Sequence, residues 1–213
     1  MEINQKQHWN SLHKAGDIAQ YSQKQTDFAE EVNKLIPADS SVLDLGCGSG
    51  NDSVYFAKHN HTVLGTDFSD IAIEKNKLHY QNLPKLQFIV QDLSDAFPFK
   101  DSSFSVMYAR LSLHYFSDKV TKQIFNEIYR VLKIQGLLCF ICKSVHDPLY
   151  GKGERIEKDM FTFNNHVRHF FSKEYVQECL AGKFEIKLLE TGEDSFYNKN
   201  SAFVKVIAQK VFS

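Results

Sequence analysis

The stretch "VLDLGCGSG", residues 42–50, constrains the fold more than any other part of the chain. Apolar residues that could end a buried strand lead directly into Gly46, Gly48 and Gly50, three of the 10 glycines among 213 residues. Glycine permits positive φ and lets the backbone approach a ligand without a Cβ in the way. Because a turn without a ligand needs fewer glycines, the stretch predicts a strand, a glycine floor under a small molecule, and a helix whose free N–H groups point toward the same ligand.

Segments typical of strands and of helices alternate along the chain. Strands are expected at residues 41–46, 62–67, 86–92, 104–110 and 136–144, and helices at 26–36, 51–59, 69–81 and 118–132. Such alternation predicts a parallel sheet with helices on both faces. A helix at 172–181 and strands at 184–191 and 201–210 follow, and the short polar link between these strands favours an antiparallel pair. Residues 145–171 are expected to be irregular, as functional or mobile loops often are.

Length and charge narrow the kinds of protein that this chain can be. The 213 residues fit a single domain, and the formal net charge of -1 gives no general attraction to nucleic acid or anionic lipid. The N-terminal "MEINQKQHWN" is too polar for a signal peptide, and no apolar run approaches the length that spans a bilayer. We therefore expect a cytoplasmic protein with neither a nucleic-acid nor a membrane partner.

Two pairs of possible metal ligands are present, and neither predicts a metal site. Cys139 and Cys142 form a C-x-x-C pair, but the surrounding run is typical of a strand, in which positions three apart point to opposite faces. No second close ligand pair completes a four-coordinate zinc site. His166 and His169 could form an i, i+3 pair only in a helix, and no nearby acid aligns with them. No metal is expected.

The glycine pattern differs from that of dinucleotide-binding enzymes, which use G-x-G-x-x-G and would need glycine where this chain has Asn51. With Asp44 the pattern is D-x-G-x-G-x-G, which resembles the first motif of the class I S-adenosylmethionine-dependent methyltransferases. The resemblance covers nearly the whole chain and implies a Rossmann-like, doubly wound α/β fold. Its sheet would have seven strands, mostly parallel with the last strand antiparallel, and helices on both faces.

The resemblance also implies which residues bind the cofactor, S-adenosyl-L-methionine, and its product, S-adenosyl-L-homocysteine. Asp67 ends the second strand, where a carboxylate can accept hydrogen bonds from both ribose hydroxyls. Asp92 matches the adenine-binding position, although it could instead only cap a turn. Arg110 would lie near the sulfonium, where it could bind a substrate anion or pair with an acid. The full predicted set is Asp44, Gly46, Cys47, Gly48, Gly50, Asp67, Phe68, Asp92, Leu93, Ala109 and Arg110.

Methyl transfer from a sulfonium is an in-line displacement, so the enzyme mostly supplies alignment and desolvation, and a base is needed only if the acceptor must lose a proton. His114, after the fourth strand, is the first candidate for such a base, although a histidine there is more often a packing residue. Two segments are expected to close the pocket: an N-terminal lid within residues 1–37 and a substrate-side insertion at 145–171. Their candidate residues are Trp9, His13, Tyr21, Tyr150, His166 and Arg168.

The acceptor is expected to be a small molecule. The chain has "ARLSLHYF" where enzymes that methylate adenine or cytosine resemble one another in an Asn/Asp-Pro-Pro-Tyr/Phe motif, and no proline is followed by cysteine. Within the family, the chain resembles small bacterial enzymes of the tellurite-resistance and thiopurine-methylating type. A quinone-biosynthesis methyltransferase and a non-catalytic cofactor-binding sensor or partner protein stay open as alternatives, whereas Asn51 opposes a nicotinamide-dependent oxidoreductase.

Overall fold

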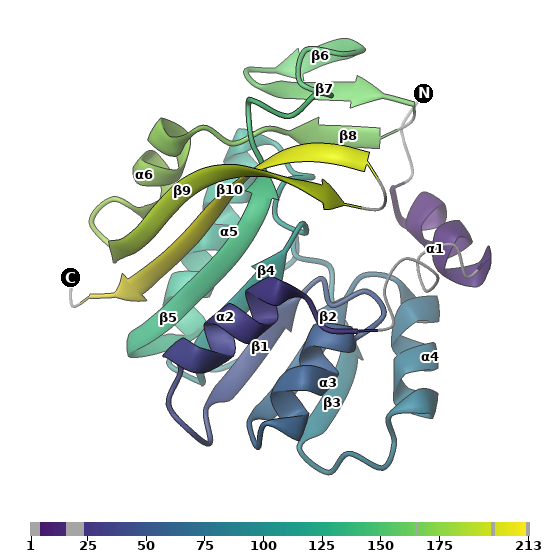
Figure 1. The fold of residues 1–213 in the computed structure, drawn as a ribbon, viewed down its shortest axis with the longest axis vertical. Helices are drawn as coiled ribbons and strands as arrows, with labels where there is room; N and C mark the ends of the chain where they lie inside the picture. The colour runs from purple at the N-terminus through teal and green to yellow at the C-terminus, as the bar shows by residue number, and fades with distance from the viewer. Residues whose placement is uncertain (1–4, 16–23, 165, 197–198, 212–213) are drawn as a thin grey trace.

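A seven-stranded sheet with strand order β3-β2-β1-β4-β5-β10-β9 forms the centre of the molecule (Figure 1). The computed structural model describes residues 5–15, 24–164, 166–196 and 199–211. The strands are β1 (Ser41–Leu45), β2 (Thr62–Asp67), β3 (Leu86–Val90), β4 (Phe104–Arg110), β5 (Leu132–Lys143), β9 (Phe184–Phe196) and β10 (Lys199–Lys210). The first five pair in parallel, and β10 runs antiparallel to both of its neighbours. The predicted mixed sheet is confirmed.

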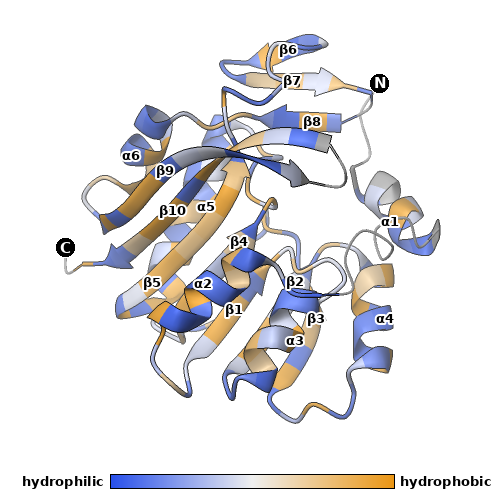
Figure 2. Cartoon of the chain, viewed as in Figure 1, coloured by the Kyte–Doolittle hydropathy of each residue, from blue (hydrophilic) through white to orange (hydrophobic). Residues whose placement is uncertain are grey.

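Helices cover both faces of this sheet, as the alternating pattern predicts. They are α1 (Gln5–Ala15), α2 (Asp27–Leu35), α3 (Asn51–Lys58), α4 (Asp70–His79), α5 (Asp118–Val131) and α6 (Lys173–Leu180). One buried cluster joins α2, α3 and α4 to one face of the strands, and a second joins α5 and α6 to the other. Cys139 belongs to the first cluster and Cys142 to the second, which confirms that they point to opposite faces. Figure 2 shows the hydrophobic central strands between these layers.

Local sequence explains where most of the helices begin. Thr26, Ser69, Ser117 and Ser172 precede α2, α4, α5 and α6, and each hydroxyl accepts a hydrogen bond from a backbone N–H of the first turn. These are preferred N-cap residues because the side-chain oxygen satisfies an N–H that has no partner within the helix. The start of α3 differs, since Gly50 precedes it with φ of 76°.

The expectation that residues 145–171 are irregular is wrong. This insertion contains β6 (Glu154–Glu157), β7 (Met160–Phe163) and β8 (His166–His169), which form a separate antiparallel sheet. Each strand has only four residues, too few to show a clear period of two in the sequence. Asp159 and Asn164, both at positive φ, lie between them. The small sheet extends from the end of the molecule where the parallel strands have their carboxyl ends (Figure 1).

One smaller expectation also needs correction. The last two strands are longer than predicted and reach Phe196 and Lys199, so residues expected in a polar link belong to a hairpin. Part of the N-terminal segment that is expected to form a lid is the helix α1, whereas Tyr21 lies outside the described residues. Strand β5 is irregular near its start, where Gln135 has φ of 62°. Within the described ranges, no helix is both long and apolar enough to cross a membrane.

Candidate functional site

The glycine-rich turn lies between the carboxyl end of β1 and the start of α3. Gly46, Gly48 and Gly50 all have positive φ, at 74°, 52° and 76°. The N–H groups of Gly46 and Cys47 both donate to the carbonyl oxygen of Thr66, each at 2.8 Å, which ties the turn to the end of β2. A left-handed backbone at three alternate positions explains why the sequence uses glycine there.

The three glycines have different surroundings. A Cβ on Gly46 would lie 2.4 Å from the Cβ of Ser112, and one on Gly50 would lie 3.0 Å from Cζ of Phe88. A Cβ on Gly48 would meet only Cε1 of His13, at 3.9 Å. Gly46 and Gly50 therefore allow tight packing beneath the turn, and Gly48 leaves its upper side open.

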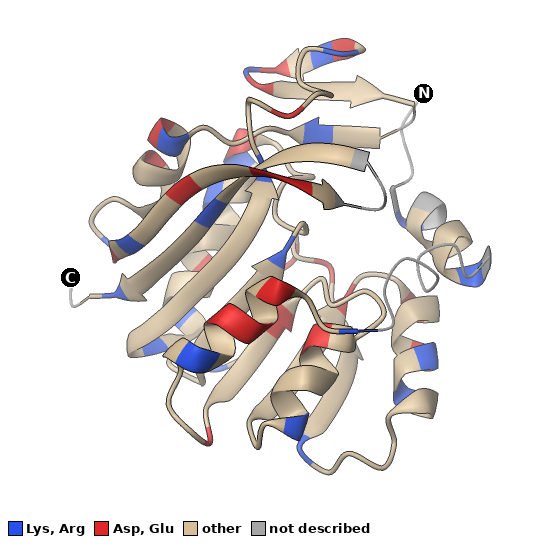
Figure 3. Ribbon diagram, viewed as in Figure 1, with Lys and Arg blue, Asp and Glu red and all other residues tan. Residues whose placement is uncertain are grey.

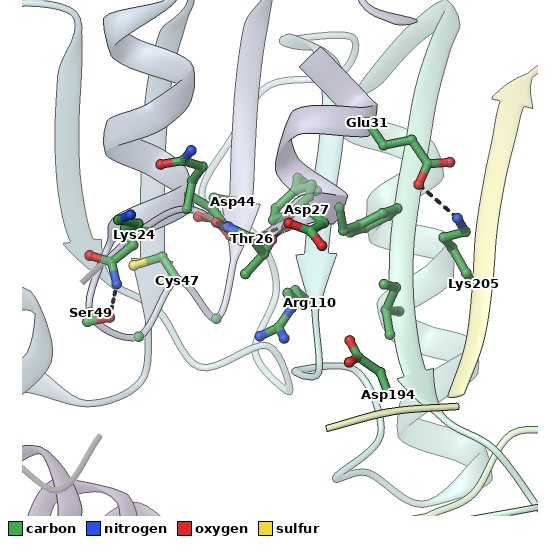
Figure 4. Close-up of a pocket in the computed structure, with 18 of the residues that line it drawn as sticks. Lys24, Thr26, Asp27, Glu31, Asp44, Cys47, Ser49, Arg110, Asp194 and Lys205 are labelled. Carbon is green, nitrogen blue, oxygen red and sulfur yellow. Dashed lines mark hydrogen bonds and ion pairs between the residues drawn. The ribbon is translucent and has the colours of Figure 1, made fainter. Parts of the chain in front are cut away.

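Two cavities open at this turn and share a wall formed by Gly46, Gly48 and Arg110. The first, here named the Asp67 cavity, has a volume of about 350 Å³ and is lined by Trp9, His13, Gly46, Gly48, Asp67, Phe68, Gln91, Asp92, Leu93, Ser94, Arg110, Leu111, Ser112, Tyr115, Phe116, Ser117 and Val120. The second, the Asp194 cavity, measures about 410 Å³ and is lined by Lys24, Gln25, Thr26, Asp27, Phe28, Glu31, Asp44, Gly46, Cys47, Gly48, Ser49, Asn51, Asp52, Tyr108, Arg110, Ile141, Asp194, Ser195, Phe203 and Lys205 (Figure 4).

Asp67, at the end of β2, has its carboxylate in the wall of the Asp67 cavity and is 7% exposed. One carboxylate oxygen accepts from the N–H of Gly48 and the other from the N–H of Ser69, each at 2.9 Å. Burial raises the pKa of Asp67, and these backbone donors and His13 act in the opposite direction. A carboxylate has about four acceptor sites, so roughly two remain for a ligand.

Asp92 follows β3, and the sequence left adenine binding and turn capping as alternatives for it. Its Oδ1 accepts from the N–H of Ser94 at 2.9 Å and from the Ser94 hydroxyl at 2.7 Å, so it caps a turn. The same residue lines the Asp67 cavity, together with Leu93 and Phe68. Four predicted cofactor-binding residues from two different strand ends therefore meet in one cavity.

Helix α1 covers the Asp67 cavity. Asn10 accepts from the Ser69 hydroxyl at 2.6 Å and donates to Asp70 at 2.8 Å, and the backbone carbonyl of His13 accepts from Nζ of Lys75 at 2.5 Å. Trp9 and His13, two predicted lid residues, both line the cavity. The Trp9 ring also meets the rings of Tyr115 and His166 edge-on at 5.6 Å, which links α1 to β8.

Other predicted residues lie outside both cavities. His114 is fully buried, its two ring nitrogens have no hydrogen-bond partner among the described residues, and burial lowers its pKa well below the usual value. The candidate base therefore does not face either cavity. Ala109 is fully buried in the core. Tyr150 donates to Asp159 within the insertion, and Arg168 lines neither cavity.

The two histidines that were considered as possible metal ligands do not have the helical i, i+3 arrangement that they would need to share a metal ion. His166 and His169 lie on strand β8 rather than on a helix, and the ring of His169 contacts Phe171 and Tyr175. Across the part of the chain that the structure describes, no three His, Cys, Asp or Glu side chains gather closely enough to hold a metal ion.

Sequence reasoning missed most of the Asp194 cavity. Its walls come from the start of α2 and from the β9–β10 hairpin, for example Asp27, Phe28, Asp194, Phe203 and Lys205, which the sequence presents only as parts of a core helix and a hairpin. Cys47 lines this cavity and not the Asp67 cavity.

Asp52, in the first turn of α3, holds part of this wall in place. Its carboxylate accepts from the backbone N–H of Thr26 at 2.8 Å, the Thr26 hydroxyl at 2.9 Å and the Tyr108 hydroxyl at 2.7 Å. The Tyr108 ring in turn stacks on Phe28, with centroids 5.3 Å apart. One carboxylate thus joins α2, α3 and β4, an arrangement for which no sequence pattern is visible.

The buried carboxyl group of Asp44 should make the free energy of unfolding depend on pH. Burial raises its pKa to about 8, while a 2.5 Å hydrogen bond from the Ser53 hydroxyl acts in the opposite direction. Because the unfolded chain loses this proton near pH 4 and the folded chain holds it, the free energy of unfolding falls as pH rises between these values. We expect Asp44→Asn, which cannot ionise, to raise the melting temperature relative to the wild type more at pH 8 than at pH 5. A difference that does not change with pH would contradict this assignment.

Comparison with known proteins agrees with this geometry. The sequence model of a family described as "Methyltransferase domain" matches residues 42–136. An uncharacterized methyltransferase of Synechocystis is 32% identical over 116 residues, which cover 54% of this chain and 52% of that protein. Phosphoethanolamine N-methyltransferase 1 of Arabidopsis thaliana is 28% identical over 181 residues, 80% of this chain and 35% of its own length. The chain thus spans about half or less of these two curated relatives.

The fold of the chain also resembles that of a solved methyltransferase structure. A S-adenosylmethionine-dependent methyltransferase of Methanosarcina mazei superposes with a TM-score of 0.78 at 24% identity, over 89% of this chain and all of that one. The glycine-rich turn, the acid at the end of β2 and the acid after β3 all lie within the residues that the family model matches. Residues 42–136 thus match the methyltransferase-domain family, and the chain has the fold of the class I S-adenosylmethionine-dependent methyltransferases.

Proposed function

We propose that this chain transfers a methyl group from S-adenosylmethionine to a small-molecule acceptor. The observation that carries the proposal is the pair of cavities that share Gly46, Gly48 and Arg110. A methyl group must pass between two molecules in contact, and this shared wall is where ligands of the two cavities would meet. Their volumes, about 350 Å³ and 410 Å³, lie in the range of small-molecule sites.

The residues of the Asp67 cavity suit an adenosyl group. Asp67 keeps acceptor capacity for two ribose hydroxyls, and Asp92 with the backbone of Leu93 would bind the adenine edge. Phe68 and Val120 add apolar walls. When bound, S-adenosylmethionine supplies the methyl group from its positively charged sulfonium. Gly48 lets the backbone approach the ligand, α1 excludes water from above, and Arg110 stands at the boundary with the acceptor.

Other parts of the proposal rest on the sequence. We propose that residues 1–213 form one methyltransferase domain, with α1 as a lid and the β6–β8 sheet as an insertion on the substrate side. The tellurite-resistance and thiopurine-methylating type stays a prediction at the level of the subfamily. The Arabidopsis relative is named for an amine acceptor, which agrees with a small molecule rather than nucleic acid.

Cofactor binding gives the first test. We expect calorimetry to show that S-adenosylmethionine and S-adenosylhomocysteine bind in the micromolar range, about -8 kcal/mol. Trp9 is the one tryptophan of the chain and lines the Asp67 cavity, so its fluorescence should change on binding, and a Trp9→Phe variant should lose that signal while still binding. Tighter binding of NAD than of either ligand would contradict the proposal.

A transfer assay separates the enzyme from a non-catalytic sensor, because binding and catalysis use different residues. With radiolabelled S-adenosylmethionine and small-molecule extract, the enzyme should produce labelled product and release S-adenosylhomocysteine. A protein that binds the cofactor and labels nothing would be a sensor or partner subunit.

A further inference from the structure

We propose that the acceptor is a small molecule with an amino group, which binds in the Asp194 cavity as an ammonium ion before it reacts. This inference rests on the proposed function, because it identifies the acceptor site by its wall shared with the Asp67 cavity.

Acidic side chains outnumber basic ones in this lining. Five carboxyl residues, Asp27, Glu31, Asp44, Asp52 and Asp194, face three basic residues, Lys24, Arg110 and Lys205. Even with Asp44 protonated near neutral pH, the acids remain in excess. Figure 3 shows acidic positions on α2 and along β9, the two elements on either side of this cavity. A net negative charge in the lining favours a ligand of positive charge.

One of the three basic residues, Lys205, is already paired with acids. Lys205 lies 2.8 Å from a carboxylate oxygen of Glu31 and 2.6 Å from one of Glu190, with 16% of its side chain exposed. In Figure 4, Arg110 points into the same cavity as Asp27 and Asp194, which come from α2 and β9. An anionic acceptor would therefore have to compete with carboxylates that belong to the protein.

Aromatic rings supply a second recognition element of different chemistry. Phe28 and Phe203 line the cavity, and the stacking of Phe28 on the buried Tyr108 fixes the orientation of its ring. The face of an aromatic ring attracts an ammonium group within about 6 Å of its centroid. Carboxylates and aromatic faces in one lining are the combination that binds an organic cation.

The same features oppose a quinol with a long isoprenoid tail. Among the described residues that line the Asp194 cavity, Phe28, Tyr108, Ile141 and Phe203 are the large apolar or aromatic side chains, and ionisable groups surround them. A volume of about 410 Å³, part of which the methionine end of the cofactor would share, suits a small amine better than a quinol ring with a long tail.

The reaction of an amine at this site balances without a further reactant. The ammonium ion first loses one proton to water. The lone pair of the neutral nitrogen then forms the N–C bond to the methyl group while the S–C bond breaks and its electron pair stays on sulfur. The positive charge passes from sulfur to the N-methylammonium product.

The test compares acceptor classes with radiolabelled S-adenosylmethionine. The amine probes are ethanolamine, tyramine and histamine, and the quinol probe is menadiol. We expect label in at least one amine and none in menadiol. Transfer to menadiol alone would keep the methyltransferase function and overturn the amine inference, as would transfer to no probe by protein that binds the cofactor. Failure to bind the cofactor would instead contradict the proposed function.

A matched pair of charge reversals tests the site itself. Asp194 lines the cavity, whereas its neighbour Glu193 on the same exposed hairpin does not. We expect Asp194→Lys to raise KM for the amine at least tenfold, with kcat and the affinity for S-adenosylhomocysteine changed less than twofold, and Glu193→Lys to have little effect. If the two variants have equal effects, the change in KM comes from general surface charge rather than from a contact in the cavity, and the assignment is overturned.

Discussion

Replacing Asp67 by alanine should weaken the binding of S-adenosylmethionine by about a hundredfold or more. The carboxylate is proposed to accept two ribose hydroxyls, and hydrogen bonds to a charged group are each worth on the order of 1.5–3 kcal/mol. Its position supports this magnitude, because it is buried in the cavity wall and its oxygens are already oriented by the N–H groups of Gly48 and Ser69.

The same variant should also have a lower melting temperature, because two backbone N–H groups lose their acceptor. Ser172→Ala is the matched control, since it removes the N-cap of α6 far from both cavities and should cost about 1 kcal/mol. Both variants should melt earlier, and only Asp67→Ala should lose cofactor affinity. Unaltered affinity in Asp67→Ala would show that the carboxylate has only a structural role.

The second large effect is expected for Gly46→Ala, which should lower the melting temperature by roughly 10 °C. An alanine at φ of 74° costs about 1–2 kcal/mol, and its Cβ would overlap that of Ser112, 2.4 Å away, at a cost of about 1–3 kcal/mol more. For a chain of this size each kcal/mol lowers the melting temperature by about 2–4 °C. Because Ser112 also lines the Asp67 cavity, cofactor affinity should fall too.

Gly182→Ala separates strain from overlap. Gly182 has nearly the same φ, 72°, but a Cβ there would meet no atom within 4 Å. It should therefore show only the backbone cost, about 4 °C, and normal cofactor affinity. If Gly46→Ala melts no earlier than Gly182→Ala, the packing of the turn against Ser112 is not tight in solution.

The sequence was most informative where a local rule determines the structure. Alternating strands and helices predicted the sheet, and the glycine spacing predicted a left-handed turn because few other residues adopt positive φ. Short elements were not predictable in this way. The strands of the insertion have four residues each, and their pairing depends on contacts along the small sheet rather than on a visible period.

The sequence predicted many residues of the Asp67 cavity but few of the Asp194 cavity. Asp67 ends β2 and Asp92 follows β3, and these two strands are neighbours in the sheet, so the positions of both acids follow from the sheet topology. Residues of the Asp194 cavity come from parts of the chain far apart in sequence. The pairing of β10 with β5 brings the hairpin near β4, and the contacts of Asp52 and Tyr108 hold the start of α2 there. His114 was misplaced because Leu111, at φ of 58°, bends the chain directly after β4 and the histidine then enters the core.

The origin of the Asp194 cavity walls has a consequence for how such enzymes diverge. The glycine turn and both acids of the Asp67 cavity fall within residues 42–136, whereas Asp27, Asp194 and Lys205 fall outside them. On the proposed assignment of the two cavities, mutations in α2 or in the terminal hairpin can alter acceptor choice during evolution while the residues proposed to bind the nucleoside stay unchanged. Relatives that match the family model equally well can thus act on unrelated metabolites. Exchanging the hairpin between two of them should change the acceptor specificity with few other changes to the chain.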